Sequence, residues 1–142
     1  MNAKNRNQSF LKMAKVRVFI VDDDPTFSKL LEHELKQANC NNYKMFESGE
    51  DCLANLKDKP KLILLDFMLG GLNGLDVLRQ IKETIPRTDV VMLTGLKDDT
   101  VKEKCMAEGA SDYILKDPDG LERFRDEIIP KYKRRRFISL FS

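Results

Sequence analysis

Four apolar segments of the chain end in residues that can do chemistry. They are Asp22-Asp23-Asp24 after residues 18–21, Asp66 after 62–65, Thr94 after 90–93 and Lys116 after 113–115. Two carboxylates about 4 Å apart repel each other by roughly 4 kcal/mol at an effective dielectric constant near 20. A cluster of them therefore takes up protons at neutral pH or binds a cation. Because only oxygen ligands are on offer, the suitable cation is Mg²⁺, and the pattern points to phosphoryl chemistry.

The stretches between these residues predict the elements that position them. Short apolar runs typical of strands buried in a parallel sheet occupy residues 16–21, 43–46, 61–65, 89–93 and 113–115. Helical spacing of apolar residues follows each run, over residues 25–38, 48–56, 75–85, 98–108 and from 119 onward. Five strand–helix units in strict alternation predict an α/β fold with a parallel sheet. Ligands of such sheets bind beyond the carboxyl ends of the strands, where the reactive residues lie.

The first and last helices carry specific expectations. The first is expected to begin at Pro25, which suits the first turn of a helix. Its apolar face is predicted to comprise Phe27, Leu30, Leu31, Leu35 and Ala38. The last helix is expected to turn Leu121, Phe124 and Ile128 inward, with Pro130 disturbing its end.

Composition excludes several classes of protein. The chain has 142 residues, 42% hydrophobic and 34% charged, which is typical of one globular domain. Its longest apolar runs are four residues, far short of the ~20 that a membrane span needs, and residues 1–17 contain no apolar core of a secretory signal. Three cysteines without a C-x-x-C pair predict reduced, buried thiols. We therefore expect a cytoplasmic protein with neither a membrane span nor disulfides.

Charge is distributed unevenly along the chain. Residues 1–17 and 131–136 each carry five basic groups and no acidic ones, whereas the stretch between them carries 15 basic and 23 acidic residues. An acidic body is not the footprint of a nucleic-acid-binding domain, so we expect no direct binding of nucleic acid. Residues 1–15 are interpreted as a basic N-terminal extension and 131–142 as a basic C-terminal tail, both solvated.

The motifs at the strand ends carry a family resemblance. They are Val21-Asp22-Asp23-Asp24-Pro25, Leu62–Leu69 with Gly74, Val91–Gly95 and Gly109–Lys116. In this order and spacing they resemble the receiver domain of bacterial two-component response regulators, over about residues 16–130. The resemblance implies a flavodoxin-like (βα)5 doubly wound fold with a five-stranded parallel sheet of order 2-1-3-4-5.

The resemblance also implies a phosphoacceptor site. Asp66 would take a phosphoryl group from a sensor histidine kinase or a histidine phosphotransfer protein. Asp23 and Asp66 would ligate Mg²⁺ directly, Met68 would add its backbone carbonyl, and Asp22 would act through water. Such a protein is not an enzyme in the usual sense. It is a signalling phosphoacceptor that catalyses its own phosphorylation and dephosphorylation.

Three further residues would bind the phosphoryl group or respond to it. Lys116 would pair with a phosphoryl oxygen, a task that suits a compact point charge. Thr94 would donate its hydroxyl to the group, and Tyr113 would swing inward behind it. That movement would reshape the face formed by the last two helices and the strand between them, where partners or a second copy would dock as a homodimer. Asp24 matches a variable position of the family and is left outside the site.

The sequence departs from the family pattern in three places. Gly70 stands where a proline is usual, which predicts a more flexible loop. Asp117 separates Lys116 from Pro118, so the cis peptide bond that customarily follows this lysine is not assured. Residues 131–142 are too short for an output domain, which fits either a stand-alone regulator or a receiver cut from a longer protein.

Two alternatives remain open from the sequence. Asp22-x-Asp24-x-Thr26 also matches the nucleophile motif of haloacid-dehalogenase-like phosphatases, with Asp22 as nucleophile and Asp24 as general acid/base. This interpretation would take Thr94 and Lys116 as later motifs and leaves Asp66 unexplained. The second alternative is an interaction module that kept the fold without being phosphorylated. The intact set of aspartates, threonine and lysine argues against it.

Overall fold

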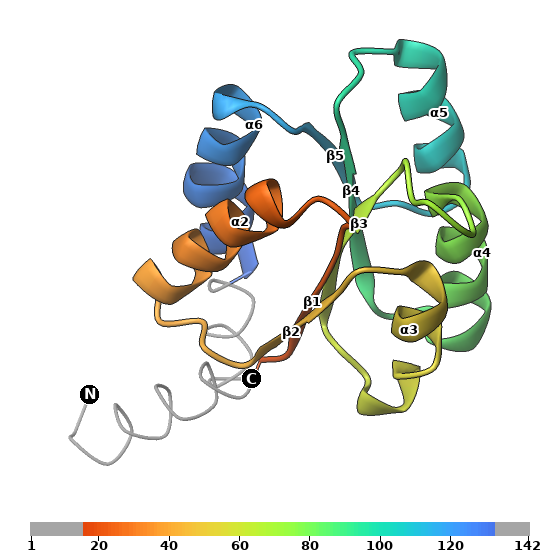
Figure 1. Ribbon diagram of the computed structural model, residues 1–142, viewed down its shortest axis with the longest axis horizontal. Coiled ribbons are helices and arrows are strands. Elements are labelled where there is room, and N and C mark those ends of the chain that lie inside the picture. Colours follow the sequence, from red (N-terminus) through yellow and green to blue (C-terminus); the bar gives the residue numbers. More distant parts are fainter. Residues whose placement is uncertain (1–15, 133–142) are drawn as a thin grey trace.

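A computed structural model describes residues 16–132 as one parallel sheet covered by helices on both faces (Figure 1). The strands are β1 (Val18–Val21), β2 (Tyr43–Phe46), β3 (Leu62–Asp66), β4 (Asp89–Thr94) and β5 (Asp112–Leu115). They lie in the order β2-β1-β3-β4-β5 and every neighbouring pair is parallel. The α/β fold and the strand order predicted from the sequence are confirmed.

The central strands are buried on both faces, as their continuous apolar sequences predict. β1 and β3 are buried throughout, whereas the edge strand β2 is half-buried or exposed along its length. The register pairs Val21 of β1 with Leu65 of β3, and Asp66 with Leu93 of β4. The residues that follow these strands therefore share the carboxyl edge of the sheet.

Five α-helices and a short 3-10 helix connect or follow the strands within residues 16–132, and a π-helical segment continues the last of them. They are α2 (Pro25–Gln37), α3 (Gly49–Leu53) with the short 3-10 helix Leu56–Asp58, α4 (Gly74–Thr84), α5 (Asp99–Ala107) and α6 (Pro118–Arg123). α2 and α6 cover one face of the sheet, and α3, α4 and α5 cover the other (Figure 1). Each of the five α-helices begins at a side chain that accepts a backbone N–H, from Asp24, Ser48, Asn73, Asp98 and Asp117 respectively.

The prediction for the buried face of α2 is wrong at Leu30. Its side chain is 44% exposed. The buried side of α2 runs through Phe27, Ser28, Leu31 and Leu35, which leaves Leu30 on the flank of the helix. Ser28, which the sequence did not assign to this face, is buried on the core side.

The last helix is irregular just before Pro130, as the sequence predicted, although it continues past the proline to Tyr132. Residues Phe124–Ile128 form a π-helical segment in which the Ile129 N–H donates to the Phe124 carbonyl. The wider π turn accommodates a proline that cannot donate a backbone hydrogen bond and whose ring would crowd a regular helical turn. Phe124 and Ile128 are buried as expected.

Several smaller expectations fall within the described residues. Cys40, Cys52 and Cys105 are buried, and none of them forms a disulfide within the described residues. No peptide bond within 16–132 is cis. Among these residues no helix has the length and apolarity required to cross a membrane. The basic extension 1–15 and residues 133–142 of the tail lie outside the described residues.

Candidate functional site

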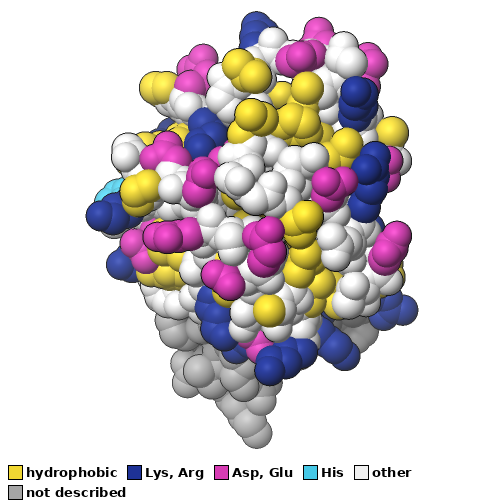
Figure 2. Space-filling model, turned by 45° about the vertical axis from the view of Figure 1, so that its right-hand side comes forward, with side chains coloured by type: hydrophobic (Ala, Val, Ile, Leu, Met, Phe, Trp, Pro, Cys, Tyr) yellow, Lys and Arg dark blue, Asp and Glu magenta, His cyan; other side chains and the backbone are white. Residues whose placement is uncertain are grey.

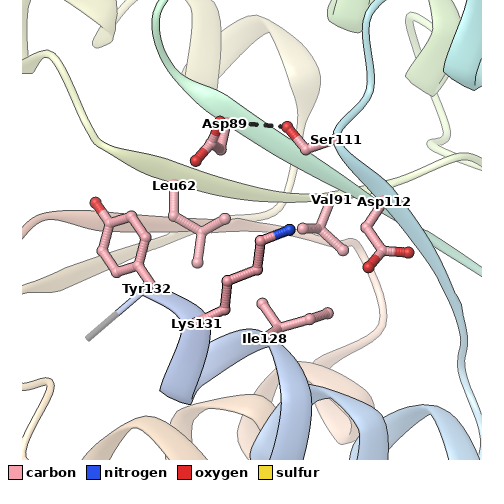
Figure 3. A pocket seen from close by; sticks show the side chains of 8 residues that line it. All are labelled: Leu62, Asp89, Val91, Ser111, Asp112, Ile128, Lys131 and Tyr132. Atoms are coloured by element: carbon pink, nitrogen blue, oxygen red, sulfur yellow. Dashed lines mark hydrogen bonds between the residues drawn. The ribbon is translucent and has the colours of Figure 1, made fainter. Parts of the chain in front are cut away.

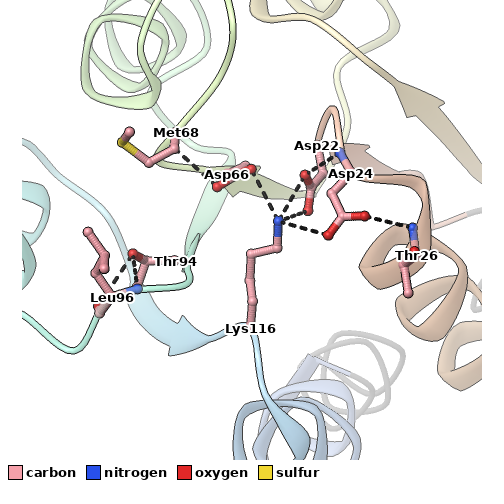
Figure 4. A network of polar contacts seen from close by, with 8 residues as sticks. All are labelled: Asp22, Asp24, Thr26, Asp66, Met68, Thr94, Leu96 and Lys116. Atoms are coloured by element: carbon pink, nitrogen blue, oxygen red, sulfur yellow. Dashed lines mark hydrogen bonds and ion pairs between the residues drawn. The ribbon is translucent and has the colours of Figure 1, made fainter.

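The carboxyl edge of the sheet gathers two buried carboxylates around one ammonium group. Asp22 follows β1, Asp66 ends β3, and Lys116 follows β5. Lys116 Nζ lies 2.8 Å from Asp22 Oδ2 and 3.3 Å from Asp66 Oδ2 (Figure 4). Both aspartates are almost completely buried. Residues more than 40 positions apart in the sequence therefore meet at one ion-pair centre.

Local backbone geometry aims the two carboxylates at this centre. Asp22 Oδ1 accepts the Asp24 N–H at 2.9 Å, and Asp66 Oδ1 accepts the Met68 N–H at 3.1 Å. Each aspartate thus bonds to the backbone two residues on, as short acidic side chains do at the start of a turn. The second oxygen of each is left facing Lys116.

Burial and like charge govern ionisation at the centre. The pKa of Asp66 is raised to about 7, first by burial and then by the nearby Asp22, while the Met68 N–H and Lys116 act in the opposite direction. Burial lowers the pKa of Lys116, but its contacts with Asp22 and Asp66 outweigh this effect and raise the pKa above its ordinary value. When both acids are ionised, two negative charges face one positive charge.

The donor set fits a divalent cation. Asp22, Asp23 and Asp66 each offer one carboxylate oxygen, and these oxygens lie within 4.8 Å of one another. Asp22 Oδ2 is buried and lies 2.8 Å from Lys116 Nζ. Hard oxygen ligands on two buried aspartates and one exposed aspartate suit Mg²⁺ or a similar ion. Met68 lies in the adjoining loop, tied to Asp66 by its N–H.

Thr94 and Tyr113 lie beside this centre and are connected through one loop. Thr94 is buried at the end of β4, and its Oγ1 accepts the Leu96 N–H at 3.1 Å. The Tyr113 hydroxyl donates to the Leu96 carbonyl at 3.0 Å, and its side chain is buried. Tyr113 thus already points inward here. The loop after β4 is held at its Leu96 backbone by both side chains.

Asp24, which the sequence analysis left outside the site, lies beside Lys116 in the structure. Its Oδ1 accepts the Thr26 N–H at 3.0 Å and caps α2, while its Oδ2 lies 3.7 Å from Lys116 Nζ (Figure 4). The sequence indicated a helix start at Pro25, but it indicated neither this cap nor the contact with Lys116, which follows β5.

Glu50 was not singled out by the sequence and restrains the glycine-rich loop. Its Oε1 accepts the Leu72 N–H at 3.1 Å. A side chain at Gly71 would approach the same oxygen to 2.7 Å. The segment around Gly70, for which the sequence predicted extra flexibility, is therefore anchored to the start of α3.

Comparison with known proteins identifies the family. The model of the response regulator receiver domain matches residues 18–127. The chain is 32% identical over 100 residues to the DNA-binding response regulator MtrA of Mycolicibacterium smegmatis, covering 70% of this chain and 43% of MtrA. It is 35% identical over 100 residues to the DNA-binding transcriptional regulator NtrC of Salmonella typhimurium, covering 70% of this chain and 21% of NtrC.

A solved structure agrees with this match. The BeF3-activated receiver domain of DrrB, a protein of Thermotoga maritima, superimposes with a TM-score of 0.73 at 33% identity, covering 84% of this chain and 97% of that domain. The chain spans less than half the length of MtrA and NtrC. The phosphatase interpretation is not favoured, because Asp66, for which it has no role, lies at the ion-pair centre. The chain belongs to the response regulator receiver domain family.

Proposed function

We propose that this receiver domain accepts one phosphoryl group on Asp66 from a sensor histidine kinase or a histidine phosphotransfer protein. The observation that carries the proposal is the position of Lys116 Nζ, within 3.3 Å of both Asp22 and Asp66. An ammonium so placed can pair with an oxygen of a phosphoryl group bound to Asp66. The same cation holds the acids together before transfer.

The chemistry asked of the chain is positioning and charge neutralisation. An oxygen of the Asp66 carboxylate forms a bond to phosphorus while the bond from phosphorus to the histidine nitrogen breaks, which leaves histidine and an aspartyl phosphate. Asp22, Asp23 and Asp66 would hold Mg²⁺ together with the Met68 carbonyl, and the bound ion supplies charge neutralisation at the transferred oxygens. Lys116 supplies further neutralisation, so no separate general base is needed. The chain would in this way promote its own phosphorylation and dephosphorylation.

The output is a change in a protein-interaction face. Thr94 would turn its hydroxyl from the Leu96 backbone to the phosphoryl group, and Tyr113 would follow through the same loop. We define the switch face as α5, β5 and α6, the elements adjoining that loop. A second copy or a partner protein would dock on this face. Because MtrA and NtrC are longer DNA-binding proteins, their activities as whole proteins are not transferred to this chain.

Surface charge supports a protein partner over nucleic acid. On the side in Figure 2, lysine and arginine side chains are interspersed with acidic ones instead of forming one basic patch. Signalling partners of this kind act in the cytoplasm, where we place the protein.

The test is phosphorylation by acetyl phosphate with Mg²⁺, followed by mass spectrometry. We expect one added phosphoryl group, none on Asp66→Asn, and a weakened reaction for Asp22→Asn through loss of a metal contact. Phosphorylation of Asp66→Asn at Asp22 would establish the phosphatase instead. A native chain that binds Mg²⁺ and takes no phosphoryl group from this donor or from a histidine kinase would be an interaction module.

A further inference from the structure

Asp24 presents a third carboxylate to Lys116, and the proposed function gives it no task. Its Oδ2 lies 3.7 Å from Lys116 Nζ, and its side chain is 48% exposed, in contrast to the buried Asp22 and Asp66. Asp24 also lines, with Lys116, the groove between the start of α2 and the start of α6. Its charge therefore stands on the solvent side of the ion-pair centre (Figure 4).

The helix cap fixes that charge in place. Asp24 Oδ1 is held by the Thr26 N–H at 3.0 Å, so the side chain is not free to turn away from Lys116. A fixed carboxylate at this position competes with an incoming phosphoryl group for the same ammonium. It also repels an anionic donor approaching from solvent, and it does so more strongly when the donor carries more negative charge.

We propose that Asp24 is a specificity-determining residue that slows phosphoryl transfer to Asp66 according to the negative charge of the phosphodonor. This inference rests on the proposed function. Asp24 acts through Lys116 and through its field at the mouth of the site, without contact with the reacting atoms. A donor of low net charge is favoured over a small dianionic metabolite.

Two small phosphodonors of different net charge test whether the effect of Asp24 depends on the charge of the donor. Near neutral pH acetyl phosphate carries two negative charges, whereas phosphoramidate carries a net charge of one because its nitrogen is protonated. In both reactions an Asp66 oxygen forms the new bond to phosphorus. The bond to the leaving group breaks at the same phosphorus, releasing acetate from acetyl phosphate and ammonia from phosphoramidate.

The variants remove the charge and keep the cap. Asp24→Asn and Asp24→Ser place side chains that cap helices as well as aspartate does. Asp98→Asn is the matched control, because Asp98 caps α5 in the same way, through the Thr100 N–H at 2.9 Å, at the same edge of the sheet. The rate constant of phosphorylation is measured for the native chain and each variant at saturating Mg²⁺, with both donors, at low and at high salt.

We expect both Asp24 variants to react about threefold faster with acetyl phosphate and less than about 1.5-fold faster with phosphoramidate, with the difference shrinking at high salt. Asp98→Asn should keep the native ratio of the two rates. Equal acceleration with both donors, no acceleration, insensitivity to salt, or the same change in Asp98→Asn would overturn the inference. A native chain that accepts no phosphoryl group from either donor would overturn the proposed function itself, an outcome distinct from a phosphorylated chain without donor discrimination.

Discussion

The amino and carboxyl edges of the sheet carry similar polar residues in opposite arrangements. At the amino edge, Thr88 Oγ1 donates to the Pro60 carbonyl at 2.7 Å, and Ser111 Oγ donates to Asp89 at 3.3 Å. At the carboxyl edge, Asp22 and Asp66 converge on the single ammonium of Lys116. The first arrangement joins hydroxyl groups to nearby acceptors, whereas the second concentrates like charges.

The hollows at the two edges differ accordingly. The cavity at the amino edge has a volume of about 50 Å³, and Lys131, Asp112 and Tyr132 are among the residues that line it (Figure 3). Pockets for small molecules are usually about 300–1,000 Å³, so this hollow is too small for such a ligand. The groove at the carboxyl edge, which Asp24 and Lys116 help to line, has a volume of about 340 Å³. The larger hollow therefore lies at the edge where like charges converge, as expected for a ligand site of a parallel sheet.

The largest effect expected from this comparison concerns Lys116. Lys116→Met should destabilise the metal-free protein by about 2–4 kcal/mol, because Asp22 and Asp66 lose the cation between them. Mg²⁺ should restore part of this loss. The control is Arg123→Met, since Arg123 contacts Asp112 at 3.0 Å in a partly exposed pair and should contribute less than about 1 kcal/mol. Urea unfolding with and without Mg²⁺ measures both; equal losses in the two variants would contradict the contrast between the edges.

The second effect concerns the pH dependence of stability. The pKa of Asp66 is about 7 in the native metal-free protein and about 4 in the unfolded chain. The native state therefore binds the proton that the unfolded state releases in this range, and stability falls as pH rises from about 4 to 7. Asp66→Asn should lack this fall and be more stable than the native chain above pH 7, by about 1–3 kcal/mol. Urea unfolding in a chelator at several pH values tests it; parallel curves for the two proteins would refute it.

The third effect concerns the lifetime of the phosphoryl group. In the receiver domain family, two positions line the path of the water that hydrolyses the aspartyl phosphate. They lie two residues after the phosphoacceptor and two residues after the threonine that corresponds to Thr94. Here they are Met68 and Leu96, which are 61% and 60% exposed and cannot orient a water by hydrogen bonding. One lost water-orienting contact is worth about 1–1.5 kcal/mol, or roughly tenfold in rate. Met68→Asn and Leu96→Glu should release phosphate faster by about that factor in a time course; variants no faster than the native chain would show that these side chains have no effect.

The sequence predicted the parts of this site that depend on periodicity. Asp22, Asp66 and Lys116 each follow an apolar strand, and parallel strands bring their carboxyl ends to one edge. No knowledge of side-chain conformation was needed to place them together. The strand order required the family resemblance, because alternation alone is compatible with several orders.

The contacts that the sequence did not predict depend on tertiary geometry. Asp24 after β1 meets Lys116 after β5, and Glu50 of α3 meets Leu72 in the loop before α4. The prediction for Leu30 was wrong because apolar spacing does not define sharply where the buried face of a helix ends. The sequence indicated a disturbance at Pro130 but not its form, a π turn before the proline.

The smallest effect on stability comes from removing one threonine hydroxyl at each edge of the sheet. Thr88→Val removes the hydrogen bond to the Pro60 carbonyl inside the amino edge and should cost about 1 kcal/mol of stability without altering phosphorylation or the switch face. Thr94→Val removes the contacts of the Thr94 hydroxyl with the Leu96 N–H at 3.1 Å and with the Leu96 carbonyl at 3.4 Å. The Leu96 side chain is largely exposed, so water can replace these contacts at little cost. Thr94→Val should nevertheless abolish the chemical-shift changes that beryllofluoride induces across α5, β5 and α6, because no hydroxyl reaches the phosphoryl position. Denaturant unfolding measures the stability of both variants, and amide spectra measure their response to beryllofluoride. A Thr94→Val protein with a native response, or changes in the native chain confined to the metal pocket, would mean that Thr94 is structural like Thr88.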